Sequence, residues 1–137
     1  MMTLVIGYFA ALLAFVVADM IWLGSMVNRI YRPAIGHIMA DTVNLPPALA
    51  FYALYPIGLM MFAIVPALKS GSLTTAALYG AAFGFFTYAT YDLSNYATLR
   101  NWPLNITLID IAWGTILGGL AASAGYLVAA KFGNGQI

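Results

Sequence analysis

The chain has 137 residues, of which 64% are hydrophobic and 7% are charged, and its mean hydropathy is +0.92. A soluble domain carries roughly 25% charged residues, and a soluble fold of this length could not bury so much apolar surface. The composition therefore indicates an integral membrane protein. The chain has no Cys, one His and a formal net charge of +1. These counts exclude disulfides, give no support to a metal site and argue against nucleic acid as a partner.

Four apolar stretches are long enough to cross a bilayer as helices, because a helical span needs about 20 apolar residues. They cover residues 3–27, 46–68, 73–99 and 104–130. Short connections join the last three, which makes consecutive helices antiparallel. The sequence therefore predicts a single transmembrane domain over residues 1–137, an all-α antiparallel bundle of four transmembrane helices. The first stretch lacks the basic flank and cleavage site of a signal peptide, so we expect it to be retained.

The connection over residues 28–45 is long enough to have a structure of its own. Pro33 suits the first turn of a helix, and Ala34 and Ile38 lie one helical turn apart. The sequence therefore predicts a short interfacial helix in the headgroup region, which ends at Asn44. An irregular polar loop is the alternative.

Charge differs between the two faces of the membrane. Four crossings place both termini on one face, side B, and the connections 28–45 and 100–103 on the other face, side A. Side A carries three arginines and side B two lysines: Arg29, Arg32 and Arg100 against Lys69 and Lys131. By the positive-inside rule, side A is predicted to face the cytoplasm and the termini to lie outside.

Three carboxyl groups lie inside the predicted spans, at Asp19, Asp92 and Asp110. Each is six to eight residues from the side A end of its helix, or about 9–12 Å at the helical rise. An Asp at the centre of a membrane helix costs about 2.5–3.5 kcal/mol. Three such groups in one half of the bilayer indicate a polar pocket near side A. The alternative is that they only join helices or pair with the arginines.

Two of the carboxyls are followed by a tryptophan at the same spacing. The sequences Asp19-x-x-Trp22 and Asp110-x-x-Trp113 place an indole beside each carboxyl on its helix. Their equal spacing suggests an internal symmetry between the first and last helices. For both indoles, an interfacial aromatic belt is the alternative interpretation.

The third carboxyl has polar neighbours on its own helix. Tyr88, Asn95 and Tyr96 share a helical stripe with Asp92, and we expect their hydroxyl and amide groups to satisfy it. The candidate ligand-binding residues are the three carboxyls with the nearest aromatic and amide side chains: Asp19, Trp22, Tyr88, Asp92, Asn95, Asp110 and Trp113. The sequence identifies no catalytic residue, metal ligand or cofactor.

Small residues mark the half of the bundle toward side B. Gly80-x-x-x-Gly84 and Gly118-x-x-x-Ala122 have the spacing that lets membrane helices approach closely. Pro56 is able to bend the second helix. We therefore expect a bundle that is tight toward side B and open toward side A.

Several motifs together resemble a known family of small bacterial proteins. They are Asp19-x-x-Trp22-Leu23-Gly24, Tyr31-x-x-x-x-Gly36-His37, Pro66-Ala-Leu-Lys-Ser-Gly71, the block from Tyr88 to Pro103, and Asp110-Ile-Ala-Trp-Gly114. Over nearly its whole length, the chain resembles domain of unknown function 2177. The resemblance implies a four-helix, multi-pass protein of the bacterial inner membrane. It implies no activity, substrate or site residues.

Three functions are compatible with these residues in a lipid bilayer. The first is binding or transport of a small ligand that is cationic, hydroxylated or aromatic, because carboxylates and π faces favour such groups. Transport would need a homo-oligomer, since four helices leave little room for alternating access. The second is an accessory subunit of a larger respiratory or photosynthetic membrane complex. The third is an enzyme that modifies a lipid or isoprenoid by acid–base chemistry, although no nucleophile–base pair supports it.

Overall fold

The structure, a computed structural model, is built from helices in the residues that it describes, 1–135 and 137. The long helices are α1 (Met2–Met26), α3 (Leu45–Leu59), α5 (Leu73–Thr98) and α6 (Leu104–Phe132). The second predicted span continues beyond α3 through a π-helical segment, η3 (Met60–Ile64), into α4 (Val65–Ser70). The four predicted helices therefore begin and end within two residues of α1, the α3–α4 span, α5 and α6 in the structure, and the all-α fold class is confirmed.

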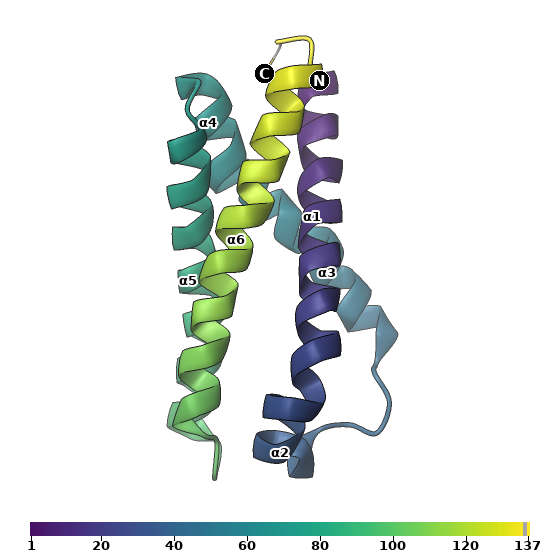
Figure 1. Cartoon of the computed structure of the whole chain (residues 1–137), viewed down its shortest axis with the longest axis vertical. Coiled ribbons are helices and arrows are strands. Elements are labelled where there is room, and N and C mark those ends of the chain that lie inside the picture. Colours follow the sequence, from purple (N-terminus) through teal and green to yellow (C-terminus); the bar gives the residue numbers. More distant parts are fainter. Residues whose placement is uncertain (136) are drawn as a thin grey trace.

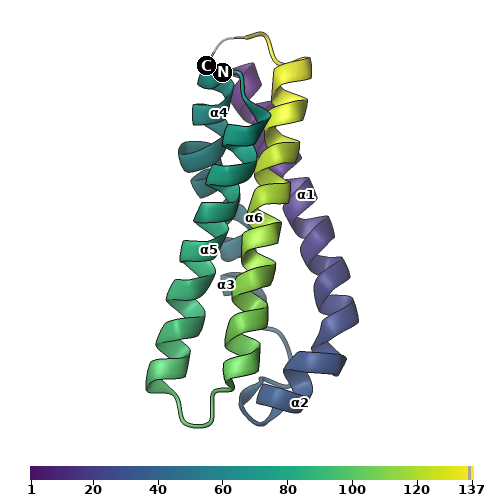
Figure 2. The same ribbon diagram turned by 60° about the vertical axis from the view of Figure 1, so that its left-hand side comes forward.

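Three helical runs in the described part of the chain are long and apolar enough to cross a membrane. They are Met2–Ile38, Leu45–Ser70 and Leu104–Phe132. Helix α5 is 26 residues long but is not one of them, because threonine, tyrosine and glycine residues lower the hydropathy even of its most apolar part. It packs against α6 along its length (Figures 1 and 2). A helical membrane bundle is thus confirmed, and the packing of α5 supports the fourth crossing, which stays a prediction.

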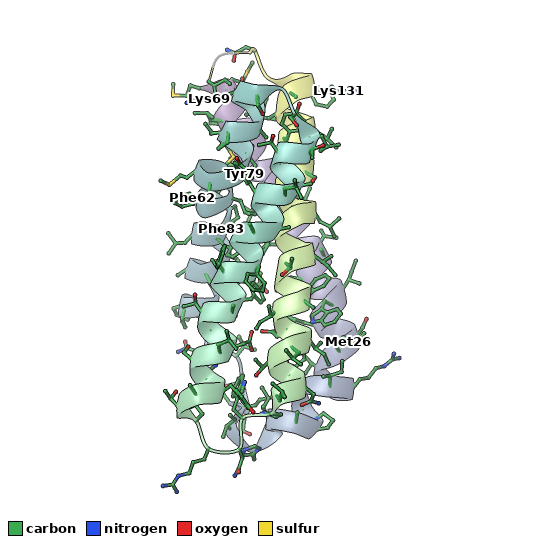
Figure 3. All side chains as sticks on the ribbon, turned by 90° about the vertical axis from the view of Figure 1, so that its left-hand side faces the viewer. Met26, Phe62, Lys69, Tyr79, Phe83 and Lys131 are labelled. Atoms are coloured by element: carbon green, nitrogen blue, oxygen red, sulfur yellow. The ribbon has the colours of Figure 1, made fainter. Side chains whose placement is uncertain are left out.

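The termini and the connections between helices lie at the two ends of the bundle that correspond to the predicted sides B and A. The chain termini lie at one end of the bundle, and the α5–α6 connection lies at the other with α2 (Arg32–Ile35) (Figure 1). Lys69 and Lys131 lie at the end of the termini (Figure 3). The structure therefore separates side A from side B as the sequence predicts.

Helix α6 is the central element, since it packs along α5 on one side and along α1 on the other. Small residues make this possible. A Cβ on Gly84 would overlap the carbonyl oxygen of Gly114, and a Cβ on Gly80 would lie 2.5 Å from that of Gly118. On the other face of α6, a Cβ on Gly125 would lie 3.0 Å from the backbone of α1. The predicted close packing of small residues is confirmed.

The second span bends between α3 and α4. Pro56 lies inside α3, where it has no N–H to continue the backbone ladder, and the π-helical segment η3 follows. The span consequently runs obliquely behind the other helices, from the α5 side at one end to the α1 side at the other (Figure 1). Toward side B it contacts α5 mainly through η3, whereas α3 makes little contact with α5. The bundle is therefore more open between α3 and α5.

The connection after α1 is helical, as predicted, but shorter. Its elements are η1 (Val27–Tyr31, π-helical), α2 (Arg32–Ile35) and η2 (Gly36–Ile38, 3-10). The helical path ends at Ile38 and not at Asn44, because Met39 adopts an extended backbone. The segment from there to α3 is irregular. Its position in the headgroup region stays a prediction.

Candidate functional site

Asp19 is held by donors from two other helices. Its side chain is buried in α1. Tyr52 of α3 donates its hydroxyl to Oδ2 of Asp19 at 2.5 Å, and Trp113 of α6 donates Nε1 to Oδ1 at 3.2 Å. The first distance is short, at the lower end of the range for a hydroxyl that donates to a carboxylate. Asp19 therefore joins α1, α3 and α6 in the half of the bundle near side A.

Asp110 is held from the connection that follows α1. Tyr31, the last residue of η1, donates its hydroxyl to Oδ1 of Asp110 at 2.5 Å. The same hydroxyl accepts a hydrogen bond from Nε1 of Trp22 at 3.0 Å. Tyr31, in the π-helical segment η1, therefore links an indole of α1 to a carboxyl of α6.

The two Asp-x-x-Trp motifs exchange partners between α1 and α6. Trp113 donates directly to Asp19, and Trp22 donates to Asp110 through a tyrosine hydroxyl. The two indoles stack between them, with ring centroids 4.5 Å apart and planes within 5° of parallel. Because α1 and α6 run antiparallel (Figure 1), each motif reaches the other's carboxyl. The symmetry suggested by the equal spacing is therefore present as reciprocal contacts.

Asp92 differs from the other two carboxyls. It is 0% exposed, and neither of its oxygens has a hydrogen-bond donor. The expectation that Tyr88, Asn95 and Tyr96 satisfy it is wrong. The ring of Tyr88 packs on Gly114 of α6, and Tyr96 is 47% exposed. Residues on the same face of a helix can contact different neighbouring helices. Sharing a face of α5 with Asp92 therefore did not bring these side chains into hydrogen-bond contact with its carboxyl group.

A cavity of about 430 Å³ lies beside these carboxyls. It is bounded by α3, α5 and α6, and its lining residues are Phe51, Tyr55, Thr87, Tyr88, Tyr91 and Asp110. Of the predicted ligand-binding residues, two line it, Tyr88 and Asp110. The hydroxyls of Tyr55 and Thr87 lie 3.3 Å apart on its wall. The cavity is thus aromatic, with one carboxyl at its edge.

The other predicted site residues lie behind or away from the cavity. Asp19, Trp22 and Trp113 belong to the hydrogen-bonded and stacked group described above and do not line the cavity. Asn95 is outside this group, but its side chain hydrogen-bonds to Tyr91, which lines the cavity. The structure therefore brings the amide to an aromatic residue of the cavity and not to a carboxyl.

The arginines do not neutralise the carboxyls. Arg29, Arg32 and Arg100 are exposed on side A. The partners of Asp19 and Asp110 are tyrosines and tryptophans. The alternative in which the intramembrane carboxyls pair with arginines is therefore wrong. Within residues 1–135 and 137, no group of three His, Cys, Asp or Glu side chains is arranged to hold a metal ion.

Comparison with known proteins identifies the family. Residues 4–127 match the family described as predicted membrane protein, DUF2177. The chain belongs to this family. No curated protein and no solved structure matches it. The motifs of the Asp-x-x-Trp pairs and of the block around Asp92 all lie within the matched part, and so do all the residues that line the cavity.

Sequence reasoning missed Tyr31 and Tyr52, the two residues that donate to the carboxyls. Tyr31 lies outside the predicted spans, and its only signal was its place in the motif that ends in Gly36 and His37. Tyr52 belongs to a helix without any charge near it, so nothing marked it among the nine tyrosines of the chain. Hydrogen-bond partners 79 and 33 residues apart in the chain depend on how the helices pack.

Proposed function

We propose that the protein binds a small aromatic or amphiphilic cation in the cavity between α3, α5 and α6. The observation that carries the proposal is the cavity itself, about 430 Å³ in volume and lined by four aromatic side chains, Thr87 and the Asp110 carboxyl. Ligand sites in proteins are of this kind: mostly apolar, about 300–1,000 Å³, with a few polar groups that fix orientation.

The charge and the rings both favour a cation. No arginine compensates the carboxyls, and the rings of Tyr55, Tyr88 and Tyr91 offer π faces on which a cation gains about 0.5–2 kcal/mol. An anion would meet only negative charge at Asp110. The site therefore suits a positively charged group attached to an apolar or aromatic body.

The position of the cavity suggests that the ligand enters from the lipid. Phe51 and Tyr91 are 42% and 57% exposed, and they belong to α3 and α5, which make little contact with each other. In a bilayer, this outer surface faces acyl chains. An amphiphile would reach the cavity sideways between these helices, with its charged group directed toward Asp110.

Binding of radiolabelled tetraphenylphosphonium, an aromatic cation, tests the proposal. The full chain in lipid nanodiscs should bind one cation per chain above the background of empty nanodiscs. Thr87→Leu adds bulk to the cavity wall, and we expect it to weaken binding about 10-fold, which is roughly 1.4 kcal/mol. Asp110→Asn should weaken it similarly through loss of the charge.

Thr90→Leu is the matched control. Thr87 and Thr90 both lie on α5, and each donates its hydroxyl to the carbonyl four residues earlier, at 2.8 and 2.6 Å. Thr90 is exposed and does not line the cavity. Thr90→Leu should therefore bind as the wild type does. Equal binding by all variants, or none by the wild type, would contradict the proposal.

The finer location and assembly are part of the proposal. The family match supports a membrane protein, and we place it in the bacterial inner membrane, as the resemblance to the family implies. If the protein also transports its ligand, two copies are needed to form a path, because one bundle is too small for alternating access. No specific observation favours the alternative roles of accessory subunit or lipid-modifying enzyme.

A further inference from the structure

Asp92 occupies a position that its surroundings do not satisfy. Its carboxyl group is fully buried, and neither oxygen receives a hydrogen bond. A lone buried carboxylate costs several kcal/mol, and a buried carboxylic acid without an acceptor loses a hydrogen bond. Whichever form it takes, the group needs a partner.

The packing of α5 on α6 directs Asp92 toward Asp110. The two helices are antiparallel, with Gly84 level with Gly114. Followed along both helices toward side A, this register places Asp110 of α6 level with Tyr88 of α5. Asp92 lies one helical turn beyond Tyr88 in the same direction. Side chains lean toward the N-terminus of their own helix. Asp92 therefore leans toward side B and Asp110 toward side A, and their carboxyl groups meet and interact.

Two carboxylates cannot hydrogen-bond to each other, since both only accept. One proton converts one of them into a donor and removes the repulsion between two like charges in a buried site. Tyr31 already donates to Oδ1 of Asp110, which leaves the other oxygen for Asp92. We propose that Asp92 and Asp110 form an acid–carboxylate pair that shares one proton, and that a cation entering the cavity releases it.

The surroundings of the pair fit this exchange. The titratable groups that face it are the hydroxyls of Tyr31 from η1 and of Tyr88 and Tyr91 from α5, and none carries a positive charge. Asp110 lines the cavity and Asp92 does not, so a bound cation meets Asp110 first. The proton leaves to water, the pair goes from one negative charge to two, and the cation restores the net charge. The release rests on the proposed function, whereas the pair does not.

Infrared spectroscopy of the full chain in nanodiscs tests the pair without any ligand. At neutral pH, the wild type should show the carbonyl stretch of a protonated carboxylic acid, shifted in D₂O. Asp92→Asn and Asp110→Asn should each remove it. Asp41→Asn changes an exposed carboxyl of the irregular segment and should leave it. Absence of the band from the wild type, or its survival in both pair variants, would overturn the proposal, and the wild-type result holds even if a variant fails to fold.

Calorimetry with tetraphenylphosphonium tests the release. This cation has no titratable proton, so any proton exchanged comes from the protein. Titrations in two buffers of different protonation enthalpy should give about one proton released per cation bound for the wild type and none for Asp92→Asn. Binding without release overturns the proposed coupling. If the wild type does not bind tetraphenylphosphonium, both the proposed function and the proton release are contradicted. The infrared band tests the Asp92–Asp110 pair independently of binding.

Discussion

Near side A, tyrosine and tryptophan side chains supply hydrogen bonds to two carboxyl groups that water would supply at a surface. Asp19 accepts one hydroxyl and one indole N–H, and Asp110 accepts a hydroxyl that an indole in turn supports. Tyrosine and tryptophan suit this task in a membrane, because each brings a donor on a large apolar ring. Other rings, those of Phe51, Tyr55, Tyr88 and Tyr91, form the wall of the cavity. The aromatic residues that stabilise Asp19 and Asp110 are therefore distinct from those that shape the proposed site.

Tyr52→Phe should destabilise the protein by about 1–2 kcal/mol. Hydrogen bonds between membrane helices average about 0.6 kcal/mol, whereas bonds to charged groups contribute about 1.5–3 kcal/mol. Asp19 keeps its bond from Trp113, which limits the loss. Thermal unfolding in a mild detergent measures the change. Tyr79→Phe is the control, because Tyr79 is 53% exposed and remote from the carboxyls. It should change the stability by less than about 0.5 kcal/mol. Similar losses for both variants would contradict the role of Tyr52.

The helices divide into a closely packed set, α1, α5 and α6, and the more loosely packed α3. Helices α5 and α6 approach until glycine backbones touch, whereas α3, on the side A half of the bent second span, makes little contact with α5. In lipid, such packing supplies the driving force that the hydrophobic effect supplies in water. The cavity forms where this close packing ends, between the α5–α6 pair and α3.

Gly84→Ala should therefore weaken the α5–α6 pair strongly. The new methyl group would overlap the backbone of Gly114, which cannot move aside as a flexible side chain could. Overpacking typically costs about 1–3 kcal/mol, and we expect a loss at the upper end, measured as the unfolding midpoint in detergent. Gly24→Ala is the control, because no atom lies within 4 Å of its Cβ position, and it should be neutral or slightly stabilising. Equal effects would show that the glycine contact is dispensable.

The sequence predicted the elements better than their contacts. Apolar runs delimit the spans, because the bilayer fixes how long a helix must be, and the Asp-x-x-Trp spacing revealed the related ends of α1 and α6. Tyr31 was not predictable, since its contact with Asp110 requires both a π-helical turn and a partner 79 residues away. The expectation for Asp92 failed because residues on one helix were treated as its partners, while the neighbouring helix determines what it meets.

The whole molecule is polarised between its two faces. Side A holds the three arginines, the short helix α2 and the nearby carboxyls, and side B holds the termini and the lysines (Figure 3). A cation that enters from the lipid would therefore meet the carboxyls in the half of the bilayer adjoining side A. Which compartment adjoins that half determines from which leaflet the ligand comes, so the orientation of the chain bears directly on its function.

Single-cysteine variants should establish the orientation and the number of crossings. The chain has no native Cys. Thr42→Cys lies after the first predicted span, and Leu73→Cys and Leu99→Cys lie at the two ends of the third; none of these changes alters a charge. By the positive-inside rule, a membrane-impermeant maleimide should label Leu73→Cys in intact bacteria, and the other two only after the cells are opened. The reverse pattern would invert the orientation. Labelling of Leu99→Cys together with Leu73→Cys would mean that α5 does not cross, and the carboxyl of Asp92 would then lie outside the bilayer half proposed for the site.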